Sequence, residues 1–260
     1  MSQSEKLSKE ERHNLITTEL NQSPAIRVSQ LASAIGVSTE TIRRDLAELE
    51  KKGLISRTYG GAAKPLTPDP EYKQRDKTFG PERGRIAKYA VDLIQDGQVI
   101  IIGSSTTTVH VATRIAAQKK NLTVFTDSII VASKLSTNPT IKTHLCPGIY
   151  KEEEFCVYGA ETVDYLSKVY ANHAILGATG LTGSGVSNAD IDIAQTYKIM
   201  AERASNVIIV ADHSKIGKTA ISTYASWDHI DTLITDIDPA DEDLMSGLRL
   251  NKVNIIVSNI

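Results

Sequence analysis

The stretch from Val28 to Leu49 constrains the fold of this 260-residue chain most, because it holds two amphipathic helical patterns separated by one glycine. Apolar residues recur at helical spacing over 28–35 and again over 42–49. Gly36 lies between the two patterns, where a left-handed backbone reverses a chain at low cost, and Ser38 is a good N-cap for the second helix. We therefore expect two helices packed across a tight turn.

The polar face of the second helix carries groups that suit DNA recognition. Arginine can bind guanine through two hydrogen bonds or contact a phosphate, and serine and threonine can bond phosphates or touch a thymine methyl group. In a helix-turn-helix the N-terminal half of the second helix enters the major groove. The candidate contacts there are Ser38, Thr39, Glu40, Thr41, Arg43 and Arg44. Taken alone, the pattern also suits a solvated face on an ordinary helix pair.

The next segment predicts a small β-wing beside these helices. Residues 54–59 alternate like a short strand, and Gly60 and Gly61 turn the chain. Basic groups in and before this segment would face the DNA phosphates. The further candidate contacts are Lys51, Lys52, Arg57 and Tyr59.

Composition and charge favour a two-domain protein of the cytoplasm. No apolar run is long enough to span a bilayer, and residues 1–11 lack the apolar core of a signal peptide. Two cysteines, Cys146 and Cys156, do not make a disulfide framework and lack metal-ligand spacing. Residues 1–65 hold ten of the 29 Lys and Arg residues and eight of the 31 Asp and Glu residues, so their net charge is +2 and that of the remainder is −4. This mild asymmetry fits a basic DNA-binding domain joined to a larger, nearly neutral domain.

Three prolines between positions 65 and 70 predict an extended, fairly stiff linker. We therefore expect a winged helix-turn-helix domain over 1–63, whose first helix covers 9–22, a linker over 64–78, and an α/β domain over 79–260. Residues 72–95 are expected to be mostly helical. Basic residues of that segment are interpreted as a solvated face; they are Lys73, Arg75, Arg83, Arg85 and Lys88.

The larger domain shows alternating strand and helix patterns. Strands are predicted at 99–102, 122–125, 174–176, 207–210, 232–234 and 253–257, and helices at 107–118, 128–135, 192–204 and 241–248. This alternation predicts a doubly wound, mostly parallel sheet with helices on both faces.

Polar loops follow several of these strands, at the edge where parallel sheets bind ligands. Residues 103–108 read Gly-Ser-Ser-Thr-Thr-Thr and open a helix, where backbone N–H groups and hydroxyls can hold a phosphate. The candidate effector contacts are Gly103, Ser104, Ser105, Thr106, Thr107, Thr108, Thr126, Asp127, Gly177, Thr179, Asp212 and Lys215. An N-cap in a Ser/Thr-rich loop, and an exposed Asp–Lys pair, would explain some of these residues without a ligand.

Other polar clusters predict no chemistry. The run at 151–154, Lys-Glu-Glu-Glu, is interpreted as an acidic loop without evident converging ligands, so we expect neither a metal site nor another cofactor. Five histidines beyond residue 100 are scattered, and their spacing indicates no catalytic triad.

Two sets of motifs resemble the DeoR family of bacterial repressors. Residues 38–46, 49–50 and 57–62, which end in Tyr-Gly-Gly-Ala, resemble the winged helix-turn-helix of that family. The loops at 103–108, 126–127, 147–148, 159–161, 176–180 and 212–217 resemble its effector domain, which is similar in fold to ribose-5-phosphate isomerase A. The resemblance extends from about residue 9 to residue 236.

This resemblance implies a repressor of a carbohydrate-utilisation operon that a phosphorylated sugar or sugar derivative releases from double-stranded DNA. A homodimer or homotetramer is expected, because two heads reading one operator need a two-fold partner. The family commonly reads Asp-Ser-Gly where this chain has Gly103, Ser104 and Ser105, so a carboxylate that could bind sugar hydroxyls is missing. Asp127 stands where the family often has asparagine.

Parts of the sequence also suit two other functions, an enzyme with an accessory DNA-binding domain and a DNA binder without a ligand. A sugar-phosphate isomerase or hydrolase with an accessory DNA-binding domain would need a general base, for which Asp127, Asp190 or Asp212 could serve. The missing acid at Gly103 weighs against it, so the chain is not expected to be an enzyme. An activator or architectural DNA binder without a ligand would leave the polar strand-end loops unexplained.

Overall fold

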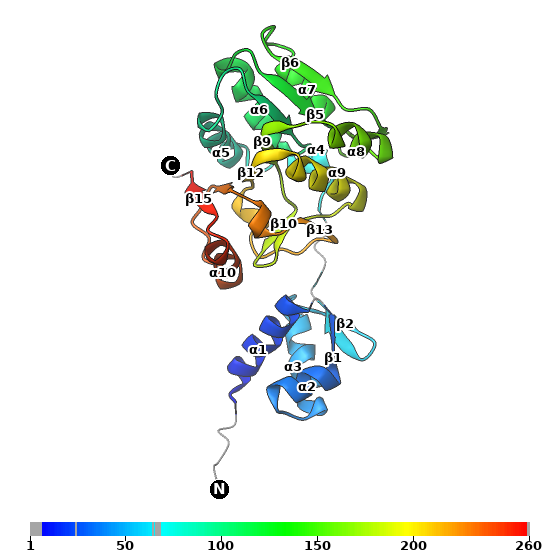
Figure 1. Ribbon diagram of the computed structural model, residues 1–260. Coiled ribbons are helices and arrows are strands. Elements are labelled where there is room, and N and C mark those ends of the chain that lie inside the picture. Colours follow the sequence, from blue (N-terminus) through cyan, green and yellow to red (C-terminus); the bar gives the residue numbers. More distant parts are fainter. Residues whose placement is uncertain (1–6, 24, 64, 66–68, 259–260) are drawn as a thin grey trace. The chain divides into compact units, whose positions relative to one another are not determined.

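The computed structural model describes residues 7–258, except residues 24, 64 and 66–68. The chain divides into two compact units, residues 1–66 and 67–260, and each is described here by itself (Figure 1). Residues 64 and 66–68 of the expected linker lie outside the described residues. None of the described helices combines the length and apolar character that crossing a bilayer requires.

The first unit consists of three helices and a three-stranded antiparallel sheet. Its elements are α1 (Lys9–Gln22), β1 (Ala25–Arg27), α2 (Val28–Ile35), α3 (Thr39–Lys51), β2 (Ser56–Thr58) and β3 (Gly61–Ala63). The sheet has the order β1-β3-β2, so β2 and β3 form the predicted wing and β1 extends it. Strand β1 was not predicted, because three residues that depend on pairing with a distant strand carry no periodic signal of their own.

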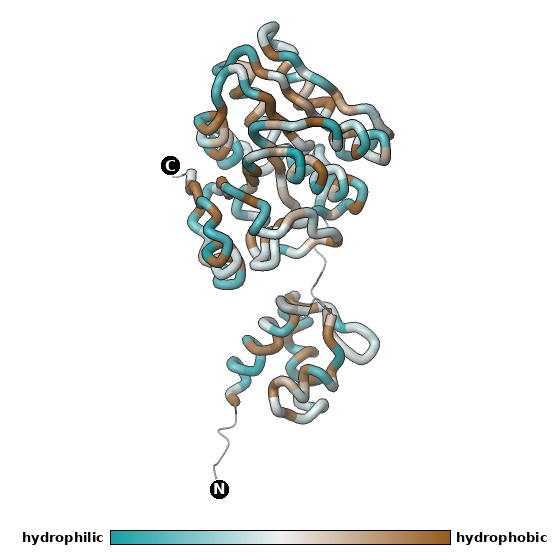
Figure 2. The backbone as a smooth tube through the Cα atoms, in the orientation of Figure 1, coloured by the Kyte–Doolittle hydropathy of each residue, from teal (hydrophilic) through white to brown (hydrophobic). Residues whose placement is uncertain are grey.

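The turn between α2 and α3 forms as the sequence predicts. Gly36 ends α2 with a positive φ of 74°, and the Oγ atom of Ser38 accepts a hydrogen bond of 3.2 Å from the backbone N–H of Thr41. The apolar faces of the helices meet in one small core, and hydrophobic and hydrophilic positions alternate along them (Figure 2). Its fully buried side chains include Ile16, Leu20, Leu31, Ile42, Leu46 and Leu49.

One ion pair inside this unit was not predicted. Asp45 lies on the core side of α3 and is 3% exposed. Arg12 of α1 binds it with two hydrogen bonds, Nε to Oδ2 at 2.8 Å and Nη2 to Oδ1 at 3.0 Å. Burial acts to raise the pKa of the Asp45 carboxyl, but the hydrogen bonds and charges of Arg12 and His13 together outweigh burial, so that pKa is lowered.

The second unit is built on a seven-stranded sheet of order β15-β14-β12-β9-β4-β5-β6, in which every pair is parallel. Its strands are β4 (Val99–Ile102), β5 (Thr123–Thr126), β6 (Lys142–Leu145), β9 (Ala171–Leu176), β12 (Ala204–Val210), β14 (Thr232–Thr235) and β15 (Asn254–Val257). The helices are α4 (Tyr72–Arg75), α5 (Gly80–Asp92), α6 (Thr106–Gln118), α7 (Ile129–Leu135), α8 (Ala160–Ser167), α9 (Ile191–Glu202) and α10 (Glu242–Leu250). This confirms the predicted doubly wound architecture.

Smaller elements flank the sheet. Strands β7 (Ile149–Lys151) and β8 (Cys156–Tyr158) form a hairpin, and β10 (Gly180–Thr182), β11 (Gly185–Asn188) and β13 (Ser222–Ala225) form a second antiparallel sheet. Two short 3-10 helices are η1 (His213–Lys215) and η2 (Trp227–His229). None of these short elements was predicted.

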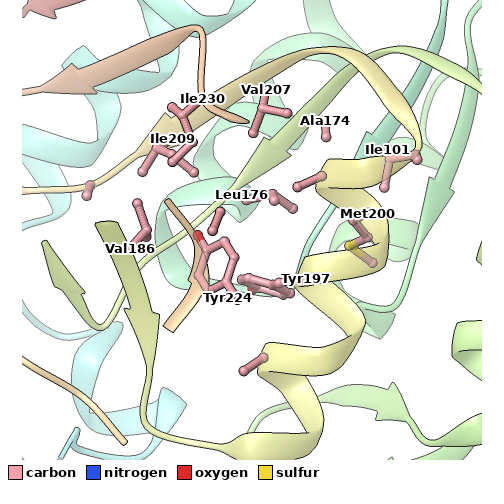
Figure 3. Close-up of a cluster of buried hydrophobic side chains, with 14 of the residues drawn as sticks. Ile101, Ala174, Leu176, Val186, Tyr197, Met200, Val207, Ile209, Tyr224 and Ile230 are labelled. Carbon is pink, nitrogen blue, oxygen red and sulfur yellow. The ribbon is translucent and has the colours of Figure 1, made fainter. Parts of the chain in front are cut away.

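Each face of the main sheet carries its own hydrophobic core. Helices α5, α6 and α7 pack on one face against Ile100 and Ile102, and α8, α9 and α10 pack on the other against Ile101. Neighbouring residues of β4 therefore point into opposite cores, which explains the unbroken apolar run. Figure 3 shows the second core, where the rings of Tyr197 and Tyr224 meet edge to face with centroids 5.2 Å apart.

Residues 72–95 are mostly helical, as predicted, and they form two helices, α4 and α5. Phe79 adopts a left-handed conformation with φ 56° just before α5, and Pro81 occupies the first turn of α5. The short helix α4 belongs to the α/β unit, because Tyr72 is buried in its core. Residues 69–78, expected as linker, thus lie within the second compact unit.

Candidate effector cavity and DNA-reading surface

A cavity of about 200 Å³ opens beyond the carboxyl ends of β4 and β9 in the second unit. That volume is below the roughly 300 Å³ at which pockets for drug-sized ligands begin, so it suits a small metabolite. Four predicted effector contacts line it, namely Ser104, Ser105, Gly177 and Thr179. The other lining residues are Asp69, Arg75, Lys151, Glu154, Ala178, Asn188, Ala189, Asp190, Ile193 and Tyr197.

Hydroxyl groups fix the loop that joins β4 to α6. The Oγ atom of Ser105 accepts a hydrogen bond of 3.0 Å from the backbone N–H of Thr108, and the Thr108 hydroxyl donates to the Gly103 carbonyl at 2.6 Å. Thr106 and Thr107 are buried, and neither they nor Thr108 belong to the cavity lining. The predicted Ser/Thr loop is thus divided, with its serines at the cavity and its threonines in the helix that supports them.

Two glycines allow the close packing behind this loop. A Cβ atom at Gly177 would lie 2.6 Å from Oγ of Ser105, so a side chain there would push into the N-cap of α6. Gly103 lies against the ring of Tyr197 and against Leu176, and it does not line the cavity. The hydroxyl of Tyr197 in turn donates to the Ser104 carbonyl.

Asp127 lies behind the cavity rather than in its lining. It is fully buried, and its Oδ2 atom accepts a hydrogen bond of 2.8 Å from the Ser104 hydroxyl. Burial raises the pKa of Asp127 to about 7, and hydrogen bonds from Ser104 and the backbone oppose that effect only in part. Thr126 is also fully buried, and its hydroxyl oxygen accepts a bond from the backbone N–H of Ser128.

Two cations reach the cavity, and each is held by a carboxylate of the same unit. The Arg75 guanidinium binds Glu154, with 3.0 Å between Nη1 and Oε1, and lies 3.3 Å from Asp69. Lys151 binds Asp190, the N-cap residue of α9. Burial acts to raise the pKa of Asp190, but its bonds with Lys151 and with α9 outweigh burial, so that pKa is lowered.

These cations were missed at the sequence level. Arg75 was interpreted as part of a solvated face, which is wrong, because its side chain is 10% exposed and bound on two sides. Lys151 and Glu154 belong to a run interpreted only as an acidic loop. Position in the sequence was the one feature that could have pointed to these cations. Arg75 comes shortly after the proline-rich segment, and Lys151 precedes three acidic residues.

Asp212 and Lys215 lie outside the cavity lining. Asp212 is 1% exposed, and its two carboxylate oxygens bind Arg83, at 3.2 Å from Nε, and Ser214. Lys215 donates to Asp69 at 3.0 Å. The interpretation of Arg83 as solvated is wrong: it is 1% exposed and also donates to the carbonyls of Arg75 and Thr78, at 2.7 Å each.

In the first unit, the N-terminal half of α3 presents its polar groups to solvent. Ser38, Thr39, Glu40, Arg43 and Arg44 are exposed, and Thr41 is half-buried. Glu40 reaches both arginines, with 3.4 Å to Nε of Arg44 and 3.9 Å to Nη1 of Arg43. These exposed ion pairs are weak, so both guanidinium groups remain available to a stronger anionic partner.

The other predicted DNA contacts lie elsewhere on the same unit. Lys51 ends α3 and Lys52 caps it, so they are about 18 Å along the helix axis from Thr39 at 1.5 Å per residue. Arg57 lies on β2, where its guanidinium approaches Glu50 to 4.0 Å, and Tyr59 is fully exposed in the turn between β2 and β3. The candidate surface thus has a helix part and a wing part.

Comparison with known proteins matches both units. Residues 12–66 match the model of a DeoR-like helix-turn-helix domain, and residues 80–237 match the model of a DeoR C terminal sensor domain. The HTH-type transcriptional repressor GlcR of Bacillus subtilis is 34% identical, with 96% of each chain covered. The glycerol-3-phosphate regulon repressor of Escherichia coli is 30% identical over 88% of this chain and 91% of its own. A putative aga operon transcriptional repressor of E. coli O157:H7 is 32% identical over 95% of this chain and 93% of its own.

Solved structures match more distantly. Ribose 5-phosphate isomerase A of Methanocaldococcus jannaschii aligns with a TM-score of 0.41 at 16% identity, covering 54% of this chain and 56% of its own. The translation initiation factor eIF-2B of Pyrococcus horikoshii aligns with a TM-score of 0.43 at 14% identity, covering 86% and 85%.

Proposed function

Since the chain belongs to the DeoR family of transcriptional regulators, we propose that it represses a carbohydrate-utilisation operon and that a phosphorylated sugar or sugar derivative relieves the repression. The observation that carries this proposal is the cavity at the strand ends, where Arg75, Lys151, Ser104 and Ser105 converge. Related proteins are named as repressors of a glycerol-3-phosphate regulon and an aga operon, which supports an effector of this chemical class.

We propose that Arg75 and the Ser104–Ser105 loop receive the phosphate. A guanidinium group can bind phosphate oxygens with two parallel hydrogen bonds, and the N-terminus of α6 adds a favourable dipole at the same loop. The carboxylate of Asp190 and the amide of Asn188, which also line the cavity, have the acceptors and donors that sugar hydroxyls require. Asp190 would thereby supply the kind of acidic contact that the glycine at position 103 does not.

The DNA-reading function is assigned to the exposed half of α3 and to the wing. We propose that Arg43 and Arg44 contact base edges and phosphates in the major groove, and that Arg57 and Tyr59 contact the adjacent backbone. A two-fold dimer or a tetramer of this chain is proposed to place two such heads on one operator. The enzyme alternative has less support, because the relatives are named as repressors or regulators and Asp212 is engaged by Arg83.

The test combines ligand binding with DNA binding. Purified protein is first screened by thermal shift against a panel of pentose, hexose and triose phosphates and their unphosphorylated parents. A ligand at 100 times its dissociation constant adds about 2.7 kcal/mol to the free energy of unfolding, so a true effector raises the melting temperature visibly. The same compound should then release the protein from DNA taken from upstream of its own gene in a gel-shift assay. Stabilisation by unphosphorylated sugars alone would contradict the proposed effector class.

A further inference from the structure

Asp69 makes three contacts that tie the start of the second unit to the effector cavity. Its Oδ1 atom accepts a hydrogen bond of 3.0 Å from Nζ of Lys215, and its Oδ2 atom accepts one of 3.1 Å from the Thr179 hydroxyl. Oδ2 also lies 3.3 Å from Nη1 of Arg75. The side chain of Asp69 is only 12% exposed, so this carboxylate lies inside the protein and is itself part of the cavity lining.

These contacts place an internal anion where the ligand anion is proposed to bind. Arg75 faces the cavity, and the groups that neutralise it are Glu154 and Asp69. Asp69 and Glu154 lie near the same guanidinium, so the two carboxylates repel each other and each is held less strongly than it would be alone. The N–H groups of Arg75 donate to Glu154 and to the Pro70 carbonyl, and Asp69 meets the same guanidinium as an ion-pair neighbour. A phosphate entering beside Arg75 therefore competes with Asp69 for its positive charge.

Asp69 lies close to the boundary between the two units, so its displacement could affect how they are connected. Strand β3 ends at Ala63 and helix α4 begins at Tyr72, and Asp69 lies between them, at the very start of the α/β unit, whose boundary with the first unit falls at 66/67. Arg75 reinforces the arrangement, because it also donates to the carbonyl of Pro70. The contacts of Asp69 and Pro70 therefore hold these two residues against the cavity.

We propose that Asp69 is an internal competitor of the effector: it occupies Arg75 and Lys215 when the cavity is free of anions, and a bound phosphate displaces it. This inference rests on the proposed function of the cavity and adds the route by which binding reaches the DNA-reading unit. Displacement frees Asp69 and Pro70 from their contacts with the cavity residues. The DNA-competent form is the one in which Asp69 is held, so the ligand and the held carboxylate oppose each other by linkage.

The first test needs no variant. Hydrogen exchange of the wild-type full-length protein is measured with inorganic phosphate or an equal ionic strength of sodium chloride, and peptides covering residues 69–78 are followed. The expected result is faster exchange of these amides in phosphate, by about 5-fold or more, while peptides from the core of α1 and α3 do not change. Unchanged or slower exchange at 69–78, with phosphate bound, would overturn the proposal.

The second test uses Asp69→Asn, which keeps the size of the side chain and removes its charge. Phosphate should bind about 5- to 10-fold more tightly to this variant, and operator affinity should fall toward that of phosphate-saturated wild type and stop responding to phosphate. The matched control is Asp164→Asn, which removes an exposed carboxylate on α8 that forms an ion pair with the exposed Lys168. This control should behave like wild type in both assays.

The two proposals fail in different ways. If neither inorganic phosphate nor any sugar phosphate binds the wild-type protein, the proposed effector site is wrong, and so is the proposed role of Asp69. If phosphate binds, and Asp69→Asn has wild-type affinity for both phosphate and operator, the effector site survives and the role given to Asp69 is wrong.

Discussion

Gly103 and Tyr197 are packed so closely that a Cβ atom at position 103 would lie 2.9 Å from Cε1 of the tyrosine ring. Leu176 closes the other side, at 3.0 Å from the same Cβ position. This packing leaves no room for a side chain at position 103, including the aspartate that the family resemblance leads us to expect there. Tyr197 fills the space behind the strand-end loop and orients Ser104 through its hydroxyl, and an aspartate at 103 would collide with it.

Substituting Gly103→Ala should therefore destabilise the α/β unit. Overpacking of a filled core costs about 1–3 kcal/mol, because the buried tyrosine ring has little room to move. The free energy of unfolding from urea titrations measures the effect. Gly84→Ala is the matched control, since a Cβ there meets nothing within 4 Å and the residue lies inside helix α5. Equal stability of the two variants would show that the loop adapts more freely than the packing indicates.

Loss of either guanidinium on α3 should weaken specific DNA binding without unfolding the protein. An arginine that contacts a base edge contributes about 1–3 kcal/mol, and one that contacts phosphate reduces the salt dependence by about one ion. Arg43→Ala and Arg44→Ala are measured by fluorescence anisotropy on operator and unrelated DNA over a range of salt. Lys168→Ala, which removes an exposed charge from the other unit, is the control. Wild-type operator affinity in both arginine variants would refute the assignment of α3.

Arg75→Gln should abolish the response to the effector while DNA binding persists, because the hydrogen bonds from Lys215 and Thr179 still hold Asp69. The substitution removes the charge that the phosphate requires and leaves Glu154 and Asp69 without their shared partner. The expected result is loss of the ligand-induced rise in melting temperature and a repressor that stays on its operator. Lys77→Gln, an exposed neighbour just after α4, keeps the net charge equal between the two variants. A normal ligand response in Arg75→Gln would mean that the phosphate binds elsewhere.

The burial of Asp127 should make stability fall as the pH rises. Its pKa is raised to about 7 in the folded protein from an ordinary value of 3.8, so the folded state holds a proton that the unfolded state has released. The stabilisation from this proton is complete below about pH 4 and is lost by about pH 7, with a span on the order of 4 kcal/mol. Asp127→Asn should remove that slope and be the more stable form at pH 8. Parallel pH profiles of the two proteins would contradict this account.

The sequence predicted those parts of the structure that depend on local patterns. The α2–Gly36–α3 turn, the wing, and the strands of the parallel sheet that carry apolar runs all follow from spacing and capping within short windows. Strand β6 was missed, because its residues, Lys-Thr-His-Leu, are mostly polar and join the sheet only by pairing with β5. Short edge strands of this kind are defined by their partners.

The candidate site was predicted in part for the same reason. Ser104, Ser105, Gly177 and Thr179 follow strands directly, and the strand-end rule locates them. The charged half of the cavity comes from segments far apart in the sequence, such as Arg75 and Glu154, and no local pattern links them. Buried ion pairs such as Arg83–Asp212 look like ordinary surface charge until the fold brings their partners together.

The two hydrogen bonds between Arg12 and Asp45 limit the ways in which a bound ligand can alter DNA binding. These bonds join α3 to α1 in addition to the apolar core, so a tilt of α3 relative to α1 would have to break both. We therefore expect a bound metabolite to change the position of the helix-turn-helix unit as a whole, and not the arrangement of its helices.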